Sequence, residues 1–197
     1  GAIEDLNTAV ISWGGITLHD IINNRFAHKA IEKGATGLIP VAAGAGGHAG
    51  TLSPFALMQE IREWFDGPVA LSGSIGNGAS ILAAQAMGAD LGYAGSAFIA
   101  TKEANADQGY KDGVVEGKAA DIVYSDLFTG VKGNYLRQSI ESAGLDPDNL
   151  PQGWKDIWGC GQGIGLINDV MSVQDMVDQF TREYRDARES LKTRFNY

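Results

Sequence analysis

The first hundred residues alternate short apolar runs with longer amphipathic stretches. The apolar runs cover residues 16–22, 37–42, 69–73 and 91–96. Short apolar runs bounded by turn residues are typical of buried parallel strands. Between them, residues 25–33, 54–65 and 78–88 place apolar side chains at helical spacing. The pattern predicts an α/β fold in which helices connect parallel strands by right-handed crossovers.

The residues at the helix ends agree with this division. Ser53 precedes Pro54, which is typical of an N-cap followed by proline at the first helical position. Gly34 and Gly88 follow the last apolar turn of their helices, where glycine is favoured because the chain takes a left-handed conformation.

Two architectures fit this alternation: an open doubly wound sheet and a (β/α)₈ barrel. No Gly-x-Gly-x-x-Gly fingerprint opens the first helix after a strand, so dinucleotide binding of the doubly wound type is not supported. Small residues instead fill the loops over 72–78 and 94–97, and barrels build phosphate sites after strands seven and eight. We therefore predict a TIM-barrel fold in which the visible strands are strands 5–8.

The expected organisation has three parts. Residues 1–103 form the C-terminal half of the barrel, and the 197-residue chain is shorter than the ~250 residues of a typical barrel. Residues 104–158 form a small helical cover over the barrel mouth, with helices over 104–118 and 134–143 and a turn-rich connection over 146–154. Residues 159–197 hold a second glycine loop and a long charged helix over 173–191 that returns to the barrel wall. One face of that helix carries apolar residues: Val173, Met176, Val177, Phe180 and Tyr184.

Composition excludes some classes of function. The net charge of −9 disfavours binding to nucleic acid or to an anionic membrane surface, and no apolar run is long enough to span a bilayer. The single cysteine, Cys160, cannot form an internal disulfide, which fits a reducing, cytoplasmic location. The chain opens on Gly1 without a leader segment, and we interpret this start as an interior cut.

One histidine stands out as candidate chemistry. His48 lies among glycine and alanine in residues 42–51, directly after a predicted strand. A backbone without side chains lets a flat ligand approach closely, and histidine serves as a general base near neutral pH. The alternative is a flexible glycine loop with an incidental histidine. His19, in a strand, and His28, on the solvent side of a helix, complete no metal-ligand spacing, and no Gly-x-Ser-x-Gly elbow supports a serine hydrolase.

Two further turns are candidates for anion binding. Gly73 and Ser74 follow the third predicted strand, and Gly95 and Ser96 follow the fourth. Backbone N–H groups at such turns, together with a hydroxyl, bind an anion without a basic side chain. Because the two strands are expected to be adjacent, the two turns form one site.

Four segments resemble a known family. They are GAGGHAG at 44–50, LSGSIGNG at 71–78, GADLGYAGSAFIATKEA at 88–104 and GQGIGLINDV at 161–170. In this order they resemble the nitronate monooxygenases, also called 2-nitropropane dioxygenases. The resemblance implies an FMN-binding (β/α)₈ barrel followed by a small helical domain. It also implies oxidation of alkyl nitronates by O₂ to a carbonyl compound and nitrite.

The resemblance gives roles to individual residues. His48 matches the base that deprotonates the α-carbon of a nitroalkane, whereas Gly73, Ser74, Gly95 and Ser96 match the FMN phosphate site. The chain departs from the family at Ser74, where a second glycine is frequent, and at Ser96 and Ala97, where Thr-Arg is frequent. Asp20 falls where relatives place Lys or Gln near the flavin ring, and Gln162 approaches the flavin or substrate from the C-terminal loop.

Other interpretations remain open at this stage. The resemblance implies that earlier barrel strands supply the flavin-ring contacts, so we expect this chain alone to bind FMN poorly, and an inactive truncated fragment is one alternative. Another is an NAD(P)H-dependent flavin reductase of quinones or enoyl thioesters on the same fold. The expected partners are a nitronate or nitroalkane and O₂, and a homodimer is the oligomeric state we consider.

Overall fold

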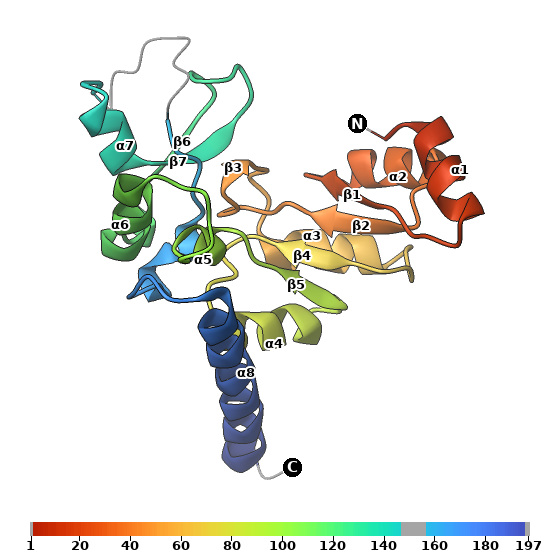
Figure 1. Cartoon of the computed structure of the whole chain (residues 1–197). Coiled ribbons are helices and arrows are strands. Elements are labelled where there is room, and N and C mark those ends of the chain that lie inside the picture. Colours follow the sequence, from red (N-terminus) through yellow and green to blue (C-terminus); the bar gives the residue numbers. More distant parts are fainter. Residues whose placement is uncertain (1, 147–156, 196–197) are drawn as a thin grey trace.

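The computed structural model describes residues 2–146 and 157–195. Its strands are β1 (Leu18–Ile21), β2 (Gly37–Pro40), β3 (Gly47–His48), β4 (Ala70–Ser72), β5 (Leu91–Tyr93), β6 (Ile122–Ser125) and β7 (Gly133–Leu136). Its α-helices are α1 (Glu4–Ser12), α2 (Asn24–Glu32), α3 (Pro54–Arg62), α4 (Gly78–Ala86), α5 (Ser96–Ile99), α6 (Gln108–Glu116), α7 (Arg137–Ser142) and α8 (Val173–Phe195). Two 3₁₀ turns, η1 (Ala119–Asp121) and η2 (Gln162–Leu166), complete the elements (Figure 1).

The four predicted parallel strands form one sheet in chain order. β1 pairs with β2 in parallel from Leu18–Gly37 to Ile21–Pro40, and β4 pairs with β5 in parallel. Parallel bridges from Leu38 to Val69 and from Val41 to Ser72 join the two pairs. The order β1-β2-β4-β5 never reverses, which is the order of consecutive strands in a barrel and differs from that of a doubly wound sheet with a switch point.

The connecting helices pack together against one face of this sheet. Ala27 and Ala30 of α2, and Leu57, Met58 and Ile61 of α3, are all buried. They share one hydrophobic cluster with strand side chains that include Leu38 and Leu71 and with Ala84 of α4. A single core for strands and helices places the helices on one side of the sheet.

The opposite face of the sheet is open at β5. A Cβ on Gly92 would lie 3.1 Å from Ile81 of α4, so Gly92 faces the helices. Leu91 and Tyr93 alternate with it, and they are 60% and 53% exposed. Within residues 2–146 and 157–195 the sheet does not close, so the structure has the strand order of a barrel without a complete barrel.

The region after residue 103 corrects part of the expectation. The predicted helix over 104–118 is present as α6. However, β6 and β7 pair in antiparallel fashion, and β3 joins them in the order β3-β7-β6, so this region is not simply helical. The helix expected over 134–143 begins only at Arg137, after the buried strand β7. The connection expected over 146–154 lies almost wholly outside the described residues.

The long C-terminal helix α8 packs against α4. A Cβ on Gly78, at the start of α4, would overlap the backbone of Phe180 and Tyr184. The N–H of Gly78 donates to Glu183 Oε2 at 2.9 Å, which places a carboxylate at the positive end of α4. Met176 and Phe180 are buried, whereas Val177 is 44% exposed. None of the described helices is long and apolar enough to cross a bilayer.

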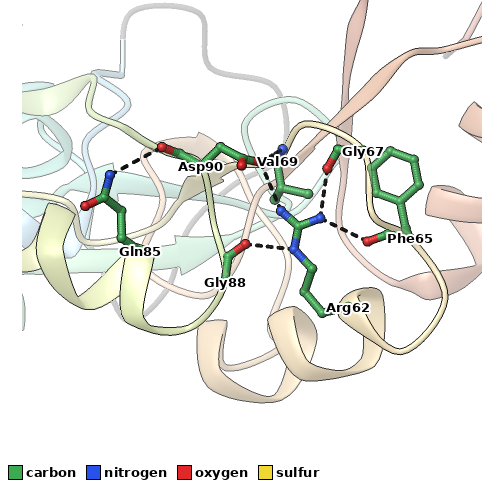
Figure 2. A network of polar contacts seen from close by, with 7 residues as sticks. All are labelled: Arg62, Phe65, Gly67, Val69, Gln85, Gly88 and Asp90. Atoms are coloured by element: carbon green, nitrogen blue, oxygen red, sulfur yellow. Dashed lines mark hydrogen bonds and ion pairs between the residues drawn. The ribbon is translucent and has the colours of Figure 1, made fainter.

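A polar network joins the ends of the parallel βα units (Figure 2). The Arg62 guanidinium donates to the carbonyls of Phe65, Gly67 and Gly88 at 2.7–2.9 Å and to Asp90 Oδ2 at 2.9 Å. The same carboxylate oxygen accepts from Val69 N at 2.8 Å. The Val69 N–H, and then the Arg62 guanidinium, hold the pKa of Asp90 below its ordinary value. The network therefore holds the start of β4 next to the start of β5 and the end of α3.

Asp90→Asn tests this network through its pH dependence. The folded-state pKa of Asp90 is lowered, so its stabilisation is present above the unfolded-state pKa of about 3.9 and is lost as the pH falls through the folded-state pKa. We expect the variant to unfold at a lower temperature than the parent at pH 7, and the difference to shrink below about pH 4.

Circular dichroism melts across this pH range measure the difference. Asp186→Asn, at an exposed position on α8, is the control and is expected to leave the melting temperature unchanged. A melting difference for Asp90→Asn that stays constant down to pH 3 would contradict the assignment.

Candidate functional site

A cavity of about 240 Å³ lies where β4 and β5 end. Its walls come from the loop after β2, the turn after β4, the turn from β5 into α5, and the glycine loop before η2. The lining residues from these four segments are Gly44, Ala45, Gly46, Gly47, Ser72, Gly73, Ser74, Ile75, Tyr93, Gly95, Ser96, Ala97, Ile99, Gly159, Gly161, Gly163 and Ile167. The carboxyl ends of parallel strands are where α/β folds bind ligands.

All four residues expected to bind phosphate line this one cavity. We call Gly73, Ser74, Gly95 and Ser96 the phosphate cradle. β4 and β5 are hydrogen-bonded neighbours, so the turns that follow them converge. The structure thus brings together residues that lie 21 to 23 positions apart in the chain, and it does so by the strand adjacency that the sequence predicted.

The turn after β4 has an unusual backbone. Gly73 has a φ of +135° and Ser74 a φ of +56°. Among the described residues, Ser74 is the only non-glycine residue with a positive φ, a conformation that costs about 1 kcal/mol or more for a residue with a Cβ. The Ser74 N–H donates to the Gly44 carbonyl at 3.4 Å, so this turn is tied to the loop after β2.

The turn after β5 leaves open space at Gly95. No atom lies within 4 Å of a Cβ built on Gly95, although this residue lines the cavity. The Ser96 hydroxyl accepts from Gly161 N at 2.9 Å and also hydrogen-bonds to the Cys160 thiol. Among the backbone hydrogen bonds of the described turns and loops, none is donated by the amide nitrogen of Gly95. This N–H is available to an anionic ligand.

Two glycine loops build the far wall by direct backbone contact. A Cβ on Gly161 would lie 2.6 Å from the carbonyl oxygen of Gly44, and one on Gly46 would lie 2.7 Å from the nitrogen of Gly161. Real Cβ atoms do not approach this closely, so both positions require glycine. The N–H of Gln162 then donates to the Gly44 carbonyl at 2.8 Å. The sequence showed both glycine runs, but nothing in it indicated that they contact each other.

Asn134 joins the same two loops from β7, and the sequence analysis missed it. Its side chain is 2% exposed and donates to the Ala45 carbonyl at 2.6 Å. Its backbone carbonyl accepts from Cys160 N at 3.1 Å. The buried side-chain amide of Asn134 thus hydrogen-bonds to one loop and its backbone carbonyl to the other, so Asn134 holds the two loops in place. Because Asn134 lies in an antiparallel sheet that was expected to be a helix, no pattern pointed to it.

The cavity contains no charged side chain among its described lining residues, so an anion there would be held by N–H and hydroxyl groups. Cys160, within the glycine loop before η2, is fully buried, and burial raises the pKa of its thiol to about 11. Burial likewise raises the pKa of Tyr110, whose hydroxyl donates to the Gly159 carbonyl. Both groups are therefore neutral at physiological pH and serve packing and hydrogen bonding.

His48 directly follows Gly47, which lines the cradle cavity, but His48 itself lies outside that cavity. It follows Gly47 in β3, and β3 pairs with β7. His48 lines two neighbouring cavities of about 240 and 470 Å³, the first with Asp20 and the second with Lys132. Its Nε2 lies 3.0 Å from Thr129 Oγ1. One loop thus supplies a wall of the cradle and, at the next residue, a solvent-exposed imidazole.

The remaining histidines have structural contacts. His19 Nε2 lies 3.2 Å from the side-chain oxygen of Asn7 in α1. His28 is exposed, as expected, and stacks on Trp64 with ring centroids 3.8 Å apart. No group of three His, Cys, Asp or Glu residues with metal-binding geometry occurs among the residues that the structure describes.

Comparison with known proteins identifies the family. A sequence profile of the nitronate monooxygenase family matches residues 14–150, which is well over half of the chain. This chain belongs to the nitronate monooxygenase family. Members of this family are FMN-dependent oxidoreductases.

Individual relatives agree with this membership. A probable nitronate monooxygenase of Staphylococcus haemolyticus is 30% identical over 163 residues, which cover 76% of this chain and 44% of the relative. A nitronate monooxygenase of Paraburkholderia phytofirmans is 31% identical over 112 residues, which cover 52% of this chain and 31% of the relative. The chain thus spans less than half the length of these curated relatives.

Solved structures share the fold. FabK from Thermotoga maritima superposes with a TM-score of 0.82 at 21% identity, over 99% of this chain and 69% of that one. A nitroalkane oxidase from Streptomyces ansochromogenes superposes with a TM-score of 0.79 at 23% identity, over 95% of this chain and 62% of that one. At these identities the likeness establishes the α/β barrel-type fold alone.

Ser74→Gly tests the strained turn of the phosphate cradle. Glycine takes a positive φ without steric cost, so we expect the free energy of unfolding to rise by up to about 1 kcal/mol. Ser72→Gly is the matched control, because Ser72 is buried in the regular strand β4 and glycine there destabilises by roughly 0.5–1 kcal/mol. Urea denaturation measures both. Equal destabilisation by the two substitutions would contradict the strain assigned to Ser74.

Proposed function

We propose that this chain binds the phosphate end of FMN in the cradle and takes part in the oxidation of alkyl nitronates or nitroalkanes by O₂. The observation that carries the proposal is the convergence of two βα turns on one cavity, with an unpaired N–H at Gly95 and no charged side chain among the described lining residues. Family membership supports the cofactor, because the family typically uses FMN. The adjacent histidine supports the chemistry.

The residues present fit a phosphate. Gly95 leaves room for an oxygen where any side chain would project, and Ser96 supplies a hydroxyl. The volume of about 240 Å³ falls below the ~300–1,000 Å³ of a usual cofactor pocket. The cavity therefore suits one end of FMN, and the flavin ring would extend beyond it.

The chain's own residues would bind the phosphate of FMN and deprotonate the nitroalkane. Gly73, Ser74, Gly95 and Ser96 would hold the phosphate through N–H and hydroxyl donors. His48 would accept the proton from the α-carbon of a neutral nitroalkane and so generate the nitronate. When bound, FMN supplies the redox chemistry that passes electrons from the nitronate to O₂. Asp20 and Lys132 line the cavities next to His48 and would border the substrate.

We also propose that the four parallel strands are strands five to eight of the family's barrel. The phosphate cradle follows β4 and β5, the last two strands of the sheet. Phosphate sites in (β/α)₈ enzymes recur after strands seven and eight. The exposed side chains on the open face of β5 are the ones that a complete barrel would enclose.

Gly95→Ala tests the phosphate site without disturbing the fold. The backbone at Gly95 (φ −118°, ψ −56°) accepts an L residue, and the added methyl meets no protein atom within 4 Å. We expect stability to change by less than ~0.5 kcal/mol. FMN affinity is expected to fall about tenfold, since displacing one charge-assisted hydrogen bond costs roughly 1.5 kcal/mol or more. Flavin fluorescence titration measures it.

Two controls distinguish an effect on binding of the FMN phosphate from an effect on binding of the flavin ring. Riboflavin lacks the phosphate, so its affinity is expected to be the same for the parent and for Gly95→Ala. Gly165→Ala adds a methyl outside the cavity, where the nearest atom is 3.7 Å away, and is expected to leave FMN binding unchanged. Equal weakening of FMN and riboflavin by Gly95→Ala would show that the cavity does not hold the phosphate.

His48→Ala tests the proposed base. Removal of a general base typically costs 10²- to 10⁴-fold, so we expect turnover of neutral nitroalkanes to fall by that order. Preformed nitronates need no deprotonation and are expected to react at nearly the parent rate. Oxygen consumption with each substrate form measures the two rates.

The pattern of loss distinguishes the outcomes. Equal losses on nitroalkane and nitronate would refute the base assignment. Rapid anaerobic bleaching of the bound flavin by NADH, without nitronate turnover, would contradict the proposed reaction and favour an NAD(P)H-dependent reductase.

A further inference from the structure

The His48 imidazole has one hydrogen-bond partner among the described residues. Its Nε2 lies 3.0 Å from Thr129 Oγ1. His48 is in β3, whereas Thr129 belongs to the segment between β6 and β7. Its Nδ1 has no partner in the described part of the chain. A neutral imidazole carries one proton, so the role of Thr129 in this bond decides which nitrogen is free to act as a base.

The single proton of the Thr129 hydroxyl is already in use. Thr129 Oγ1 donates to the Val131 carbonyl at 3.0 Å and accepts from Val131 N at 3.3 Å. Tyr135 Oη lies 3.3 Å from the same oxygen. A hydroxyl donates only once, so with its proton on the Val131 carbonyl the Thr129 oxygen accepts from His48, and His48 Nε2 then carries the proton.

We infer that Thr129 is a positioning residue that holds His48 in the Nε2–H tautomer, so that Nδ1 is the basic atom. This inference rests on the proposed role of His48 as the base. In the step it prepares, the α-carbon C–H bond of the nitroalkane breaks and an Nδ1–H bond forms. The electron pair moves into the C=N bond of the nitronate, and His48 becomes an imidazolium that still donates to Thr129.

Thr129 makes the contact that determines the tautomer of His48. The charged groups that share cavities with His48 are Asp20 on one side and Lys132 on the other, and neither is hydrogen-bonded to the ring. Tyr135 reaches His48 only through Thr129. A net hydrogen bond of ordinary strength biases a two-state equilibrium about fivefold, which is the size of effect expected from Thr129.

His19 provides an internal reference. The Asn7 side chain donates from Nδ2 to the Lys33 carbonyl at 2.7 Å, which turns its oxygen toward His19 Nε2. His19 is therefore also expected to be the Nε2–H tautomer, for a reason independent of Thr129. Any change that spares His19 but affects His48 is local to the proposed contact.

Long-range ¹H–¹⁵N spectra of the imidazole rings test the inference in the 197-residue chain without flavin or substrate. At about pH 8, where imidazoles are neutral, protonated and unprotonated ring nitrogens resonate far apart. His48 of the parent is expected to show a protonated Nε2 and an unprotonated Nδ1. Thr129→Val removes the acceptor at nearly constant shape and is expected to reduce the preference about fivefold. Thr129→Ser is expected to restore it, with His19 unchanged throughout.

Each outcome decides the inference. A parent His48 protonated on Nδ1, or a His48 tautomer unchanged in Thr129→Val, overturns it. Kinetics then separate it from the proposed function: Thr129→Val is expected to slow nitroalkane turnover about fivefold and to spare preformed nitronates. If the spectra behave as expected while neither substrate is oxidised, the tautomer assignment stands and the proposed function fails.

Discussion

The site depends on the direct contact of two glycine loops. The backbones of the loop after β2 and the loop before η2 are in contact at Gly44, Gly46 and Gly161. A methyl group on either Gly46 or Gly161 would overlap the backbone of the other loop. This contact brings a segment more than a hundred residues away in the chain against the carboxyl ends of the parallel strands. Without it, the cavity at the ends of β4 and β5 would have no far wall.

The same contact couples the anion site to the candidate base. Asn134 in β7 bonds to both loops, and β7 also pairs with β3 at Gly47 and His48. The position of His48 is therefore set from the region after residue 103, through β7 and Thr129. Gly47 lines the cradle cavity and His48 follows it directly. One wall of the cavity and the proposed base therefore lie on one short stretch of chain.

The sequence predicted the parts of the fold that local physics determines. Short apolar runs gave all four parallel strands, and Gly34 and Gly88 ended their helices with the expected positive φ. The convergence of Gly73 and Gly95 followed from the adjacency of their strands. The antiparallel sheet could not be predicted, because β3 has two residues and exists only through its pairing with β7. Residues 134–136 also run directly into helix α7, and no change in the pattern of polar and apolar residues marks the end of the strand. The sequence therefore predicted one helix over both.

Other features required three-dimensional contacts that no spacing encodes. Arg62 bonds to carbonyls that follow its own helix and to Asp90, 28 positions later. Thr129 lies 81 positions from His48. Such residues look like ordinary surface positions in the sequence. Their importance comes from acceptors and donors supplied by distant segments, which is why the convergence of the two turns was predicted and its supporting contacts were not.

The central claim is that backbone N–H groups of the cradle hold a phosphate. Amide ¹H–¹⁵N spectra of the chain, titrated in parallel with FMN and with riboflavin, test it most directly. The account predicts that the resonances of Gly73, Ser74, Gly95 and Ser96 shift with FMN and not with riboflavin, because only FMN offers the phosphate oxygens. Identical shifts with both flavins, or FMN-dependent shifts confined to other residues, would contradict it.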